Sequence, residues 1–250
     1  MHFHHKKIIY FGHHKCESTW IHLILRKISQ KLMLKLDYVH SPRQFNQDLS
    51  GYIQSNKIDM LTYANADTAY VRGLKEFRGF HVIRDIRDIA VSSYYSHLYS
   101  HDTSVWPALV ERRKKLQQLN KADGLLMDMK NIQGGVFDRI AAWDYKHPDI
   151  FELKMEELTL HPLSHFKKIF AFLGIETELP GLGLENILSE TSFKTLSQGR
   201  KPGEENIRHH YRKGIAGDWI NHFDEVHKEF IKERYGNFLI EHGYEKDLDW

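Results

Sequence analysis

The stretch KKIIYFGHHKCESTW near the start of the chain constrains its fold more than any other segment. The apolar run at residues 8–11 predicts a buried strand, Gly12 predicts a tight turn, and Ser18 and Thr19 begin an amphipathic helix. A strand, a loop and a helix start in this order bind phosphate-like anions, because the first helical N–H groups point at the ligand and the helix dipole favours negative charge. Lys15 adds a full positive charge inside the loop.

This loop differs from the nucleotide-triphosphate loop GxxxxGK[ST]. Counted from Gly12, that pattern requires glycine at position 17 and lysine at position 18, where this chain has Glu17 and Ser18. The segment therefore predicts an anion-binding loop that is not built for a magnesium nucleotide. A strand-to-helix turn with incidental polar residues is the alternative interpretation.

Short apolar runs alternate with helical patterns along the rest of the chain, which is typical of a parallel sheet covered by helices. Further strands are expected at 34–40, 59–65, 79–85 and 150–155. Helices are expected at 43–55, 88–101, 106–119, 133–146, 163–173, 185–191 and 224–242, with a polar loop at 196–212. We therefore predict a three-layer α/β fold of the P-loop-like kind, with a central, mostly parallel sheet of about five strands, in a single domain over residues 1–250.

Composition narrows the classes of protein. The net charge of +2 gives no global sign of a nucleic-acid partner. The single cysteine, Cys16, rules out an intramolecular disulfide and favours a reducing compartment, so we expect a cytoplasmic location. No apolar run reaches the length of a membrane span. Histidines are numerous near the start, at His2, His4, His5, His13 and His14, but no metal-ligand framework surrounds them, so no metal site is predicted.

A second anion contact is predicted where the fourth strand ends. Arg84 follows that strand and Ser92 lies eight positions later on the next helix. Ligands of open α/β sheets gather at the carboxyl ends of strands, and an arginine there can bind a phosphate through two N–H groups. An ion pair of Arg84 with Asp85 or Asp88 is the alternative, and Arg87 is expected to pair with a nearby carboxylate.

A third anion contact is predicted far along the chain, in the segment HYRKGIAGDWINHF. Arg212 and Lys213 precede Gly214, and Gly217 follows at a GxxG spacing. Adjacent cations beside glycines form a flexible, backbone-rich anion site. A basic surface loop is the alternative.

Together these motifs resemble those of sulfotransferases that use 3′-phosphoadenosine-5′-phosphosulfate (PAPS). The matching segments, in chain order, are Lys15–Trp20, the R-x-x-[RK]-D-x-x-x-S frame at 84–92, the T-S-F stretch ending at Phe193, and RKGxxGDWxxxF at 212–223. Two positions depart from the family pattern: Glu17 stands where a glycine is usual, and Met155 where a tyrosine is usual.

The resemblance implies a donor site for PAPS and for its product adenosine 3′,5′-bisphosphate. In that reading the 5′-phosphosulfate contacts Lys15, Cys16, Glu17, Ser18 and Thr19, adenine packs against Trp20 and Phe193, and the 3′-phosphate contacts Arg84, Ser92, Arg212, Lys213 and Gly214. The sulfuryl group would pass in line to a hydroxyl, with an amine as the alternative acceptor, and Lys15 would neutralise the leaving oxygen. Cationic side chains supply the neutralisation, so no metal is required.

The general base is less well defined. Where many cytosolic relatives carry Lys-x-His, this chain has Tyr63-Ala64-Asn65. His97 and His101, four residues apart on one helix, are the candidate bases, and Asp67 is a further alternative. A surface role for all three stays open.

Two other functions remain as alternatives, namely a P-loop kinase-like phosphotransferase and a non-catalytic nucleotide-binding module. The acceptor is expected to be a small or acyl-type hydroxylated molecule, held between the 94–106 region and loops at 120–135 and 196–211. The sequence does not indicate an oligomeric state.

Overall fold

The computed structural model describes residues 6–104, 106–176 and 181–250. His2, His4 and His5, which were considered as metal ligands in the sequence analysis, lie outside the described residues. Two compact units are present. Unit 1 comprises Met1–Ile83 and Ala142–Thr195, and unit 2 comprises Arg84–Ala141 and Leu196–Trp250. The single domain expected from the sequence stays a prediction.

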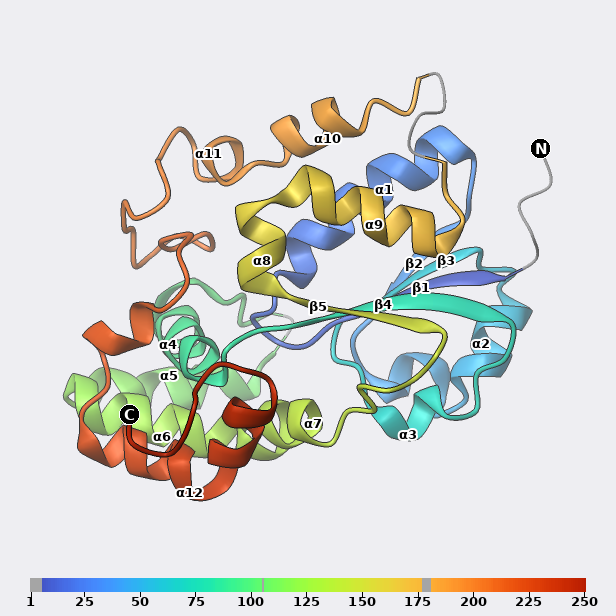
Figure 1. Ribbon diagram of the computed structural model, residues 1–250. Coiled ribbons are helices and arrows are strands. Elements are labelled where there is room, and N and C mark those ends of the chain that lie inside the picture. Colours follow the sequence, from blue (N-terminus) through green and yellow to red (C-terminus); the bar gives the residue numbers. More distant parts are fainter. Residues whose placement is uncertain (1–5, 105, 177–180) are drawn as a thin grey trace. The chain divides into compact units, whose positions relative to one another are not determined.

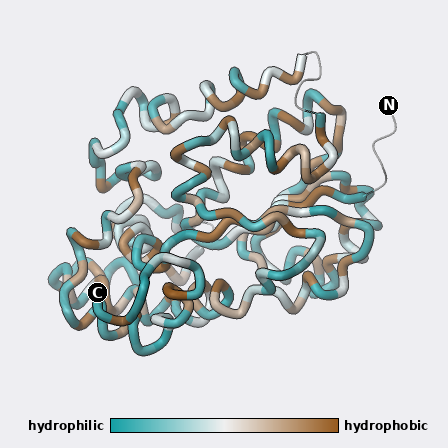
Figure 2. The backbone as a smooth tube through the Cα atoms, in the orientation of Figure 1, coloured by the Kyte–Doolittle hydropathy of each residue, from teal (hydrophilic) through white to brown (hydrophobic). Residues whose placement is uncertain are grey.

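Unit 1 contains a five-stranded sheet in the order β2-β3-β1-β4-β5, in which every neighbouring pair is parallel. The strands are β1 (Lys7–Phe11), β2 (Leu36–Val39), β3 (Met60–Tyr63), β4 (Phe77–Ile83) and β5 (Ile150–Lys154). Figure 2 shows hydrophobic residues concentrated along these strands, as expected for a sheet buried on both faces. The predicted parallel sheet of about five strands is confirmed.

Close packing of the central strands depends on one glycine. A Cβ atom on Gly79 of β4 would lie 2.7 Å from the carbonyl oxygen of Ile9 and 2.6 Å from the ring of Phe11 in β1. Only glycine therefore allows β4 to pair with β1 in this register, in which Ile9 faces Gly79.

Helices cover both faces of the sheet, which gives unit 1 three layers (Figure 1). Helices α1, α8 and α9 lie on one face, and α2 and α3 lie on the other (Figure 1). On the α2 and α3 side, Ile9, Phe11 and Leu61 of the sheet join Leu49 and Ile53 in one buried cluster. The helical segments of unit 1 are α1 (Ser18–Leu32), η1 (Pro42–Phe45), α2 (Leu49–Ser55), α3 (Thr68–Val71), α8 (Met155–Leu160), α9 (Pro162–Leu173), α10 (Leu184–Glu190) and α11 (Phe193–Leu196, whose last residue is counted with unit 2).

Unit 2 is built from helices and connecting loops. Its segments are α4 (Ile86–Tyr95), the π-helix η2 (Ser96–Ser100), α5 (Ala108–Gln118), α6 (Lys121–Ile132), the π-helix η3 (Gln133–Phe137), α7 (Asp138–Ala141), η4 (Asp218–Asn221) and α12 (Glu225–Glu241). Asp85 caps α4 by accepting a hydrogen bond from the backbone N–H of Arg87 at 2.9 Å. Across the described ranges, no helix is long and apolar enough to cross a membrane.

Two sequence-based assignments are wrong. The region expected to form a loop at 120–135 is largely helix α6, which begins at Lys121. The helix expected at 133–146 ends at Ala141, and an irregular segment leads from there to β5.

Candidate functional site

The loop after β1 is held by a glycine that no other residue can replace without rearrangement. The N–H of Gly12 donates to the carbonyl of Tyr63 at 2.9 Å, and its own carbonyl accepts from Ala66 at 2.8 Å. A Cβ atom here would lie 2.5 Å from the Tyr10 hydroxyl and 2.6 Å from Oγ of Ser18. The crowding explains why position 12 is a glycine, and the turn itself follows at residues 14–17, where the N–H of Cys16 donates to the carbonyl of His13 at 3.1 Å.

The hydroxyl groups of Tyr10 and Ser18 form hydrogen bonds to the backbone of this loop. Tyr10 Oη donates to the carbonyl of Cys16 at 3.2 Å and lies 3.3 Å from Oγ of Ser18, which donates to the carbonyl of His13 at 3.2 Å. Burial raises the pKa of Tyr10 well above 10.0, so its hydroxyl stays a proton donor at neutral pH. The backbone path between His13 and Ser18 is thus fixed from inside the unit.

Two residues of the loop adopt left-handed backbone conformations, Lys15 with φ of 64° and Glu17 with φ of 58°. Glu17 is the N-cap residue of α1, so Ser18 and the exposed Thr19 supply the first N–H groups of the helix. A left-handed backbone is least costly for glycine, so the torsion explains why a glycine would suit position 17. The predicted strand, loop and helix start are all present, with Lys15 partly exposed between them.

The aromatic residues predicted to contact adenine lie in unit 1. Trp20 is 8% exposed and packs edge-on against Phe166, with ring centroids 5.7 Å apart. Phe193 begins α11 and is half-buried, and Met155 is buried at the start of α8. Trp20 therefore contributes to the core, and contact with a base stays a prediction for both aromatic rings.

The residues predicted to bind the 3′-phosphate all belong to unit 2. Arg84 is only 7% exposed and its charge acts on Asp88, so the ion pair with a neighbouring carboxylate stays an alternative to phosphate binding. Ser92 is half-buried on the second turn of α4. Arg212, Lys213 and Gly214 come from the segment before η4.

The carboxylate of Asp218 forms ion pairs with both cations of this segment, Arg212 and Lys213. Its carboxylate lies 2.5 Å from Nη2 of Arg212 and 2.6 Å from Nζ of Lys213. His222 Nε2 and Asn221 Nδ2 are each 3.1 Å away. Burial would raise the pKa of Asp218, but hydrogen bonds from Lys213 and Arg212 outweigh it and hold that pKa well below 3.8. The segment thus surrounds one small anionic group with positive charge.

Asp88 joins this segment to helix α4. Its carboxylate accepts hydrogen bonds from the backbone N–H of Gly217 at 2.6 Å and of Trp219 at 3.0 Å. Burial raises the pKa of Asp88 and the nearby Arg84 opposes that shift. The same carboxylate therefore interacts with Arg84 and with the backbone beside Lys213, a link that sequence reasoning missed. Asp88 already stood in a matched motif, which was the available signal.

The candidate bases differ in their surroundings. His97 is fully buried on the π-helix η2, and its Nδ1 lies 2.8 and 3.0 Å from the two oxygens of Asp128. His101 is half-buried, with its ring edge-on to His97 at 5.8 Å. Asp67 caps α3 by accepting from the N–H of Ala69 at 3.0 Å. His97 thus forms a carboxylate–imidazole pair with Asp128, which was missed because its segment was expected to be a loop.

One group in the described part of the chain has the composition of a metal site. Ligand atoms of Glu205, Asp218 and His222 lie within 4.8 Å of one another. Arg212 and Lys213 already pair with Asp218, and a metal ion there would have to displace both cations. Arg212 also pairs with Glu205, so both carboxylates of this group are already bound to cationic side chains.

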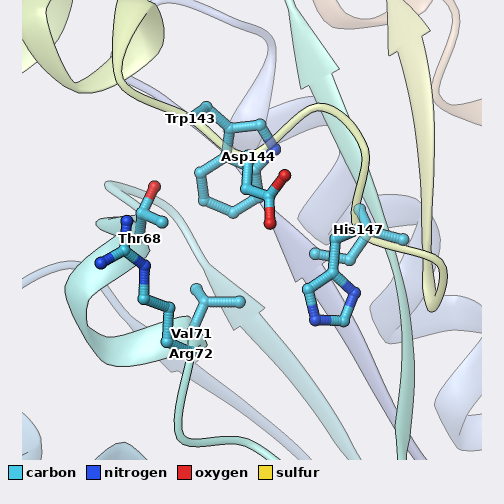
Figure 3. Close-up of a pocket in the computed structure, with 7 residues that line it drawn as sticks. Thr68, Val71, Arg72, Trp143, Asp144 and His147 are labelled. Carbon is cyan, nitrogen blue, oxygen red and sulfur yellow. The ribbon is translucent and has the colours of Figure 1, made fainter.

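A small pocket lies elsewhere in unit 1. Figure 3 shows Thr68 and Arg72 of the α3 region opposite Trp143, Asp144 and His147. Its volume is about 10 Å³, room for about one water molecule. It includes none of the predicted site residues and is too small for a nucleotide.

A parallel sheet with strand order β2-β3-β1-β4-β5, in which a loop leads from β1 into helix α1, defines a P-loop-like α/β protein. Residues 6–243 match the family model described as "Sulfotransferase domain", and the chain belongs to that family.

Similar proteins agree with this family. A flavonol sulfotransferase-like protein of Flaveria bidentis is 32% identical over 166 residues, which are 62% of this chain and 52% of that protein. Human sulfotransferase 1C2 is 25% identical over 170 residues, with the same coverage of 62% and 52%. The chain thus spans about half the length of these curated relatives.

Solved structures share the fold. Mouse sulfotransferase SULT7A1, complexed with PAP, superimposes with a TM-score of 0.61 at 18% identity, covering 95% of this chain and 86% of that one. Retinol dehydratase in a complex with retinol and PAP gives a TM-score of 0.61 at 16% identity, covering 96% and 82%. At these identities the likeness establishes the fold.

Proposed function

We propose that this protein transfers a sulfuryl group from PAPS to a hydroxyl group, with an amine as the alternative acceptor. The observation that carries the proposal is the pairing of Arg212 and Lys213 with one carboxylate, in the same unit as Arg84 and Ser92. Two cations around one small anionic group suit a phosphate dianion. Membership of the sulfotransferase family supports the same chemistry.

The loop of unit 1 is proposed to bind the 5′-phosphosulfate. Gly12 and Tyr10 fix its backbone, Ser18 and Thr19 begin the helix, and Lys15 is partly exposed. As the S–O bond to the donor breaks, negative charge develops on the bridging oxygen and the Lys15 ammonium neutralises it. These cationic groups are proposed to act without a divalent metal.

His97 is proposed as the general base, with His101 as the second candidate and Asp67 as the third. A base must accept the acceptor's proton as the new S–O bond forms, and imidazole is suited to this near neutral pH. The pairing of His97 with Asp128 at 2.8 Å supports the first choice.

The acceptor is proposed to be a small, partly apolar molecule with a hydroxyl group. Retinol and androsterone occupy solved structures of retinol dehydratase, a structural neighbour of this chain. We further propose a cytoplasmic location and no nucleic-acid partner, because the chain has one cysteine and a net charge of only +2.

Calorimetric titration of the full chain tests the donor assignment. We expect adenosine 3′,5′-bisphosphate to bind in the presence of EDTA and more tightly than ATP-Mg. Tighter binding of ATP-Mg would favour a kinase-like function and overturn the proposal.

A Lys15→Ala variant tests the catalytic role. We expect it to retain bisphosphate binding while its turnover of PAPS with a screened alcohol falls about 100-fold or more. Undiminished turnover would remove Lys15 from the mechanism, and absence of turnover in the unaltered protein with every alcohol would favour a binding module.

A further inference from the structure

The guanidinium of Arg87 is enclosed by residues from three separate segments of unit 2. Asp85 binds it through Nε at 3.0 Å and Nη2 at 2.7 Å, and Glu245 binds Nη1. The same group lies over the ring of Trp219 at 3.9 Å and over that of Trp250 at 4.4 Å. Arg87 is 2% exposed, so these contacts are almost fully removed from water, where charge–ring attraction is strongest.

The residues that surround the Arg87 guanidinium are here called the cage. Trp219 connects this cage to Arg212 and Lys213, the cations predicted to bind phosphate. It directly follows Asp218, the residue that holds Arg212 and Lys213, and its N–H donates to Asp88. Any movement of the Trp219 ring away from Arg87 would therefore act on the backbone that carries Asp218. Two consecutive residues thus link the cage to the cations.

The segment after α12 supplies the other side of the cage. It folds back along α12, as Figure 1 shows, and Leu248 packs so closely on the helix that a Cβ on Gly236 would lie 2.4 Å from it. Lys232 of α12 lies over the Trp250 ring at 5.0 Å. The Trp250 indole N–H is buried, and none of the described residues accepts a hydrogen bond from it. The ring therefore contributes through its face and its apolar surface.

We propose that Glu245 and Trp250, here called the tail pair, are positioning residues for the 3′-phosphate contacts. They hold Arg87 against Trp219 and so keep Asp218 where it orients Arg212 and Lys213. This inference rests on the proposed function, because it assumes that these cations meet the 3′-phosphate of the donor. The tail pair itself does not touch the nucleotide.

Hydrogen exchange tests the positioning step without any ligand. In Trp250→Ala, the N–H groups of Gly217 and Trp219 should exchange at least tenfold faster, because their bonds to Asp88 open more often. Trp250→Phe retains a ring over Arg87 and should restore slow exchange. Unchanged exchange in Trp250→Ala would overturn the inference, whatever the ligand proves to be.

Nucleotide binding tests the consequence. Trp250→Ala should weaken binding of adenosine 3′,5′-bisphosphate by roughly tenfold, but leave binding of adenosine 5′-monophosphate, which lacks the 3′-phosphate, within about twofold. Glu245→Gln should act in the same direction, and Trp250→Phe should recover most of the affinity. Asp249→Asn, an exposed neighbour in the same segment, is the matched control and should bind both nucleotides normally.

The outcomes separate the two proposals. Equal losses for both nucleotides, or full bisphosphate affinity in Trp250→Ala, would overturn the role of the tail pair while the donor assignment stands. Failure of the unaltered protein to bind the bisphosphate, with exchange still accelerated in Trp250→Ala, would instead overturn the donor assignment and leave the mechanical link intact.

Discussion

Nδ1 of His97 lies 2.8 Å from Oδ1 of Asp128, and both side chains are fully buried. A carboxylate at Nδ1 favours the tautomer that carries its proton there and makes Nε2 the basic nitrogen. The carbonyls of His97 and His101 also accept hydrogen bonds from Arg113, at 2.7 Å each, which fixes the backbone of the π-helix. The pair is thus held by its backbone as well as by its side chains.

We expect Asp128→Asn to lower turnover by about 100-fold or more, because an amide that donates to Nδ1 reverses the tautomer. Steady-state kinetics with PAPS and a screened alcohol would measure this, and bisphosphate affinity should not change. Turnover of His97→Ala should fall by as much, and turnover of the double variant, with both substitutions, should fall little further. Asp123→Asn, an exposed acid on the same helix, is the control. Wild-type rates in His97→Ala, His101→Ala and Asp67→Asn alike would place the base elsewhere.

Gly12→Ala should lower the free energy of unfolding by about 1–3 kcal/mol, because its Cβ would lie 2.5 Å from the Tyr10 hydroxyl. Bisphosphate affinity should fall with it, since the loop would shift. The matched control is Gly73→Ala, where no atom lies within 4 Å of the new Cβ. Urea denaturation of both variants provides the comparison, and equal midpoints would argue against crowding at Gly12.

Glu17→Gly should raise the free energy of unfolding by up to about 1 kcal/mol, because φ of 58° suits glycine. Loss of the carboxylate should also strengthen bisphosphate binding about two- to fivefold. Met33→Gly separates the two effects. Met33 has φ of 55° and is 91% exposed at the end of α1, so its replacement should stabilise the fold without altering affinity. An equal gain in affinity in both variants would contradict an electrostatic role for Glu17.

Asp218 should contribute to the loss of stability in acid. Its pKa is lowered in the folded state, so the unfolded state binds more protons near pH 4 and below. Its stabilising effect is therefore fully present above its ordinary value of 3.8 and declines as pH falls toward the folded pKa. Asp218→Asn should cost about 3 kcal/mol at pH 7, because Arg212 and Lys213 lose their shared partner.

Urea midpoints at pH 7 and pH 3 would measure this difference. The difference in urea midpoint between the unaltered protein and Asp218→Asn should be smaller at pH 3 than at pH 7. A gap that widens in acid would show that the assigned shift has the wrong sign. Asp88, whose pKa is raised by burial, should contribute in the opposite sense.

Helix α6 shows why one part of the fold was not predicted. The segment 120–135 was expected to be a loop, yet Leu125, Met129 and Ile132 are buried at helical spacing. The structure accounts for Gly124: a Cβ there would lie 3.0 Å from the ring of Tyr94, so α6 packs closely on α4. The sequence alone does not distinguish a glycine required for close helix packing from one required for a turn.

The strands and the motif cations were predictable because both are local signals. Buried strands carry continuous apolar runs, and Lys15, Arg84 and Lys213 stand in recognisable spacings. The contacts that join distant segments were not predictable. Asp88 and Gly217, for example, are 129 positions apart, and no pattern in either segment indicates their hydrogen bond. Arg87 was expected to pair with a carboxylate, and its bonds to Asp85 and Glu245 confirm this.

Cys16 is a natural probe of the loop between β1 and α1. It is the single thiol among 250 residues, and its side chain is fully buried between His13 and Ser18. A thiol reagent can reach it only when this loop opens, so the alkylation rate of the unmodified protein follows that one motion. Slower alkylation in the presence of a nucleotide would report occupancy of the loop without any engineered label.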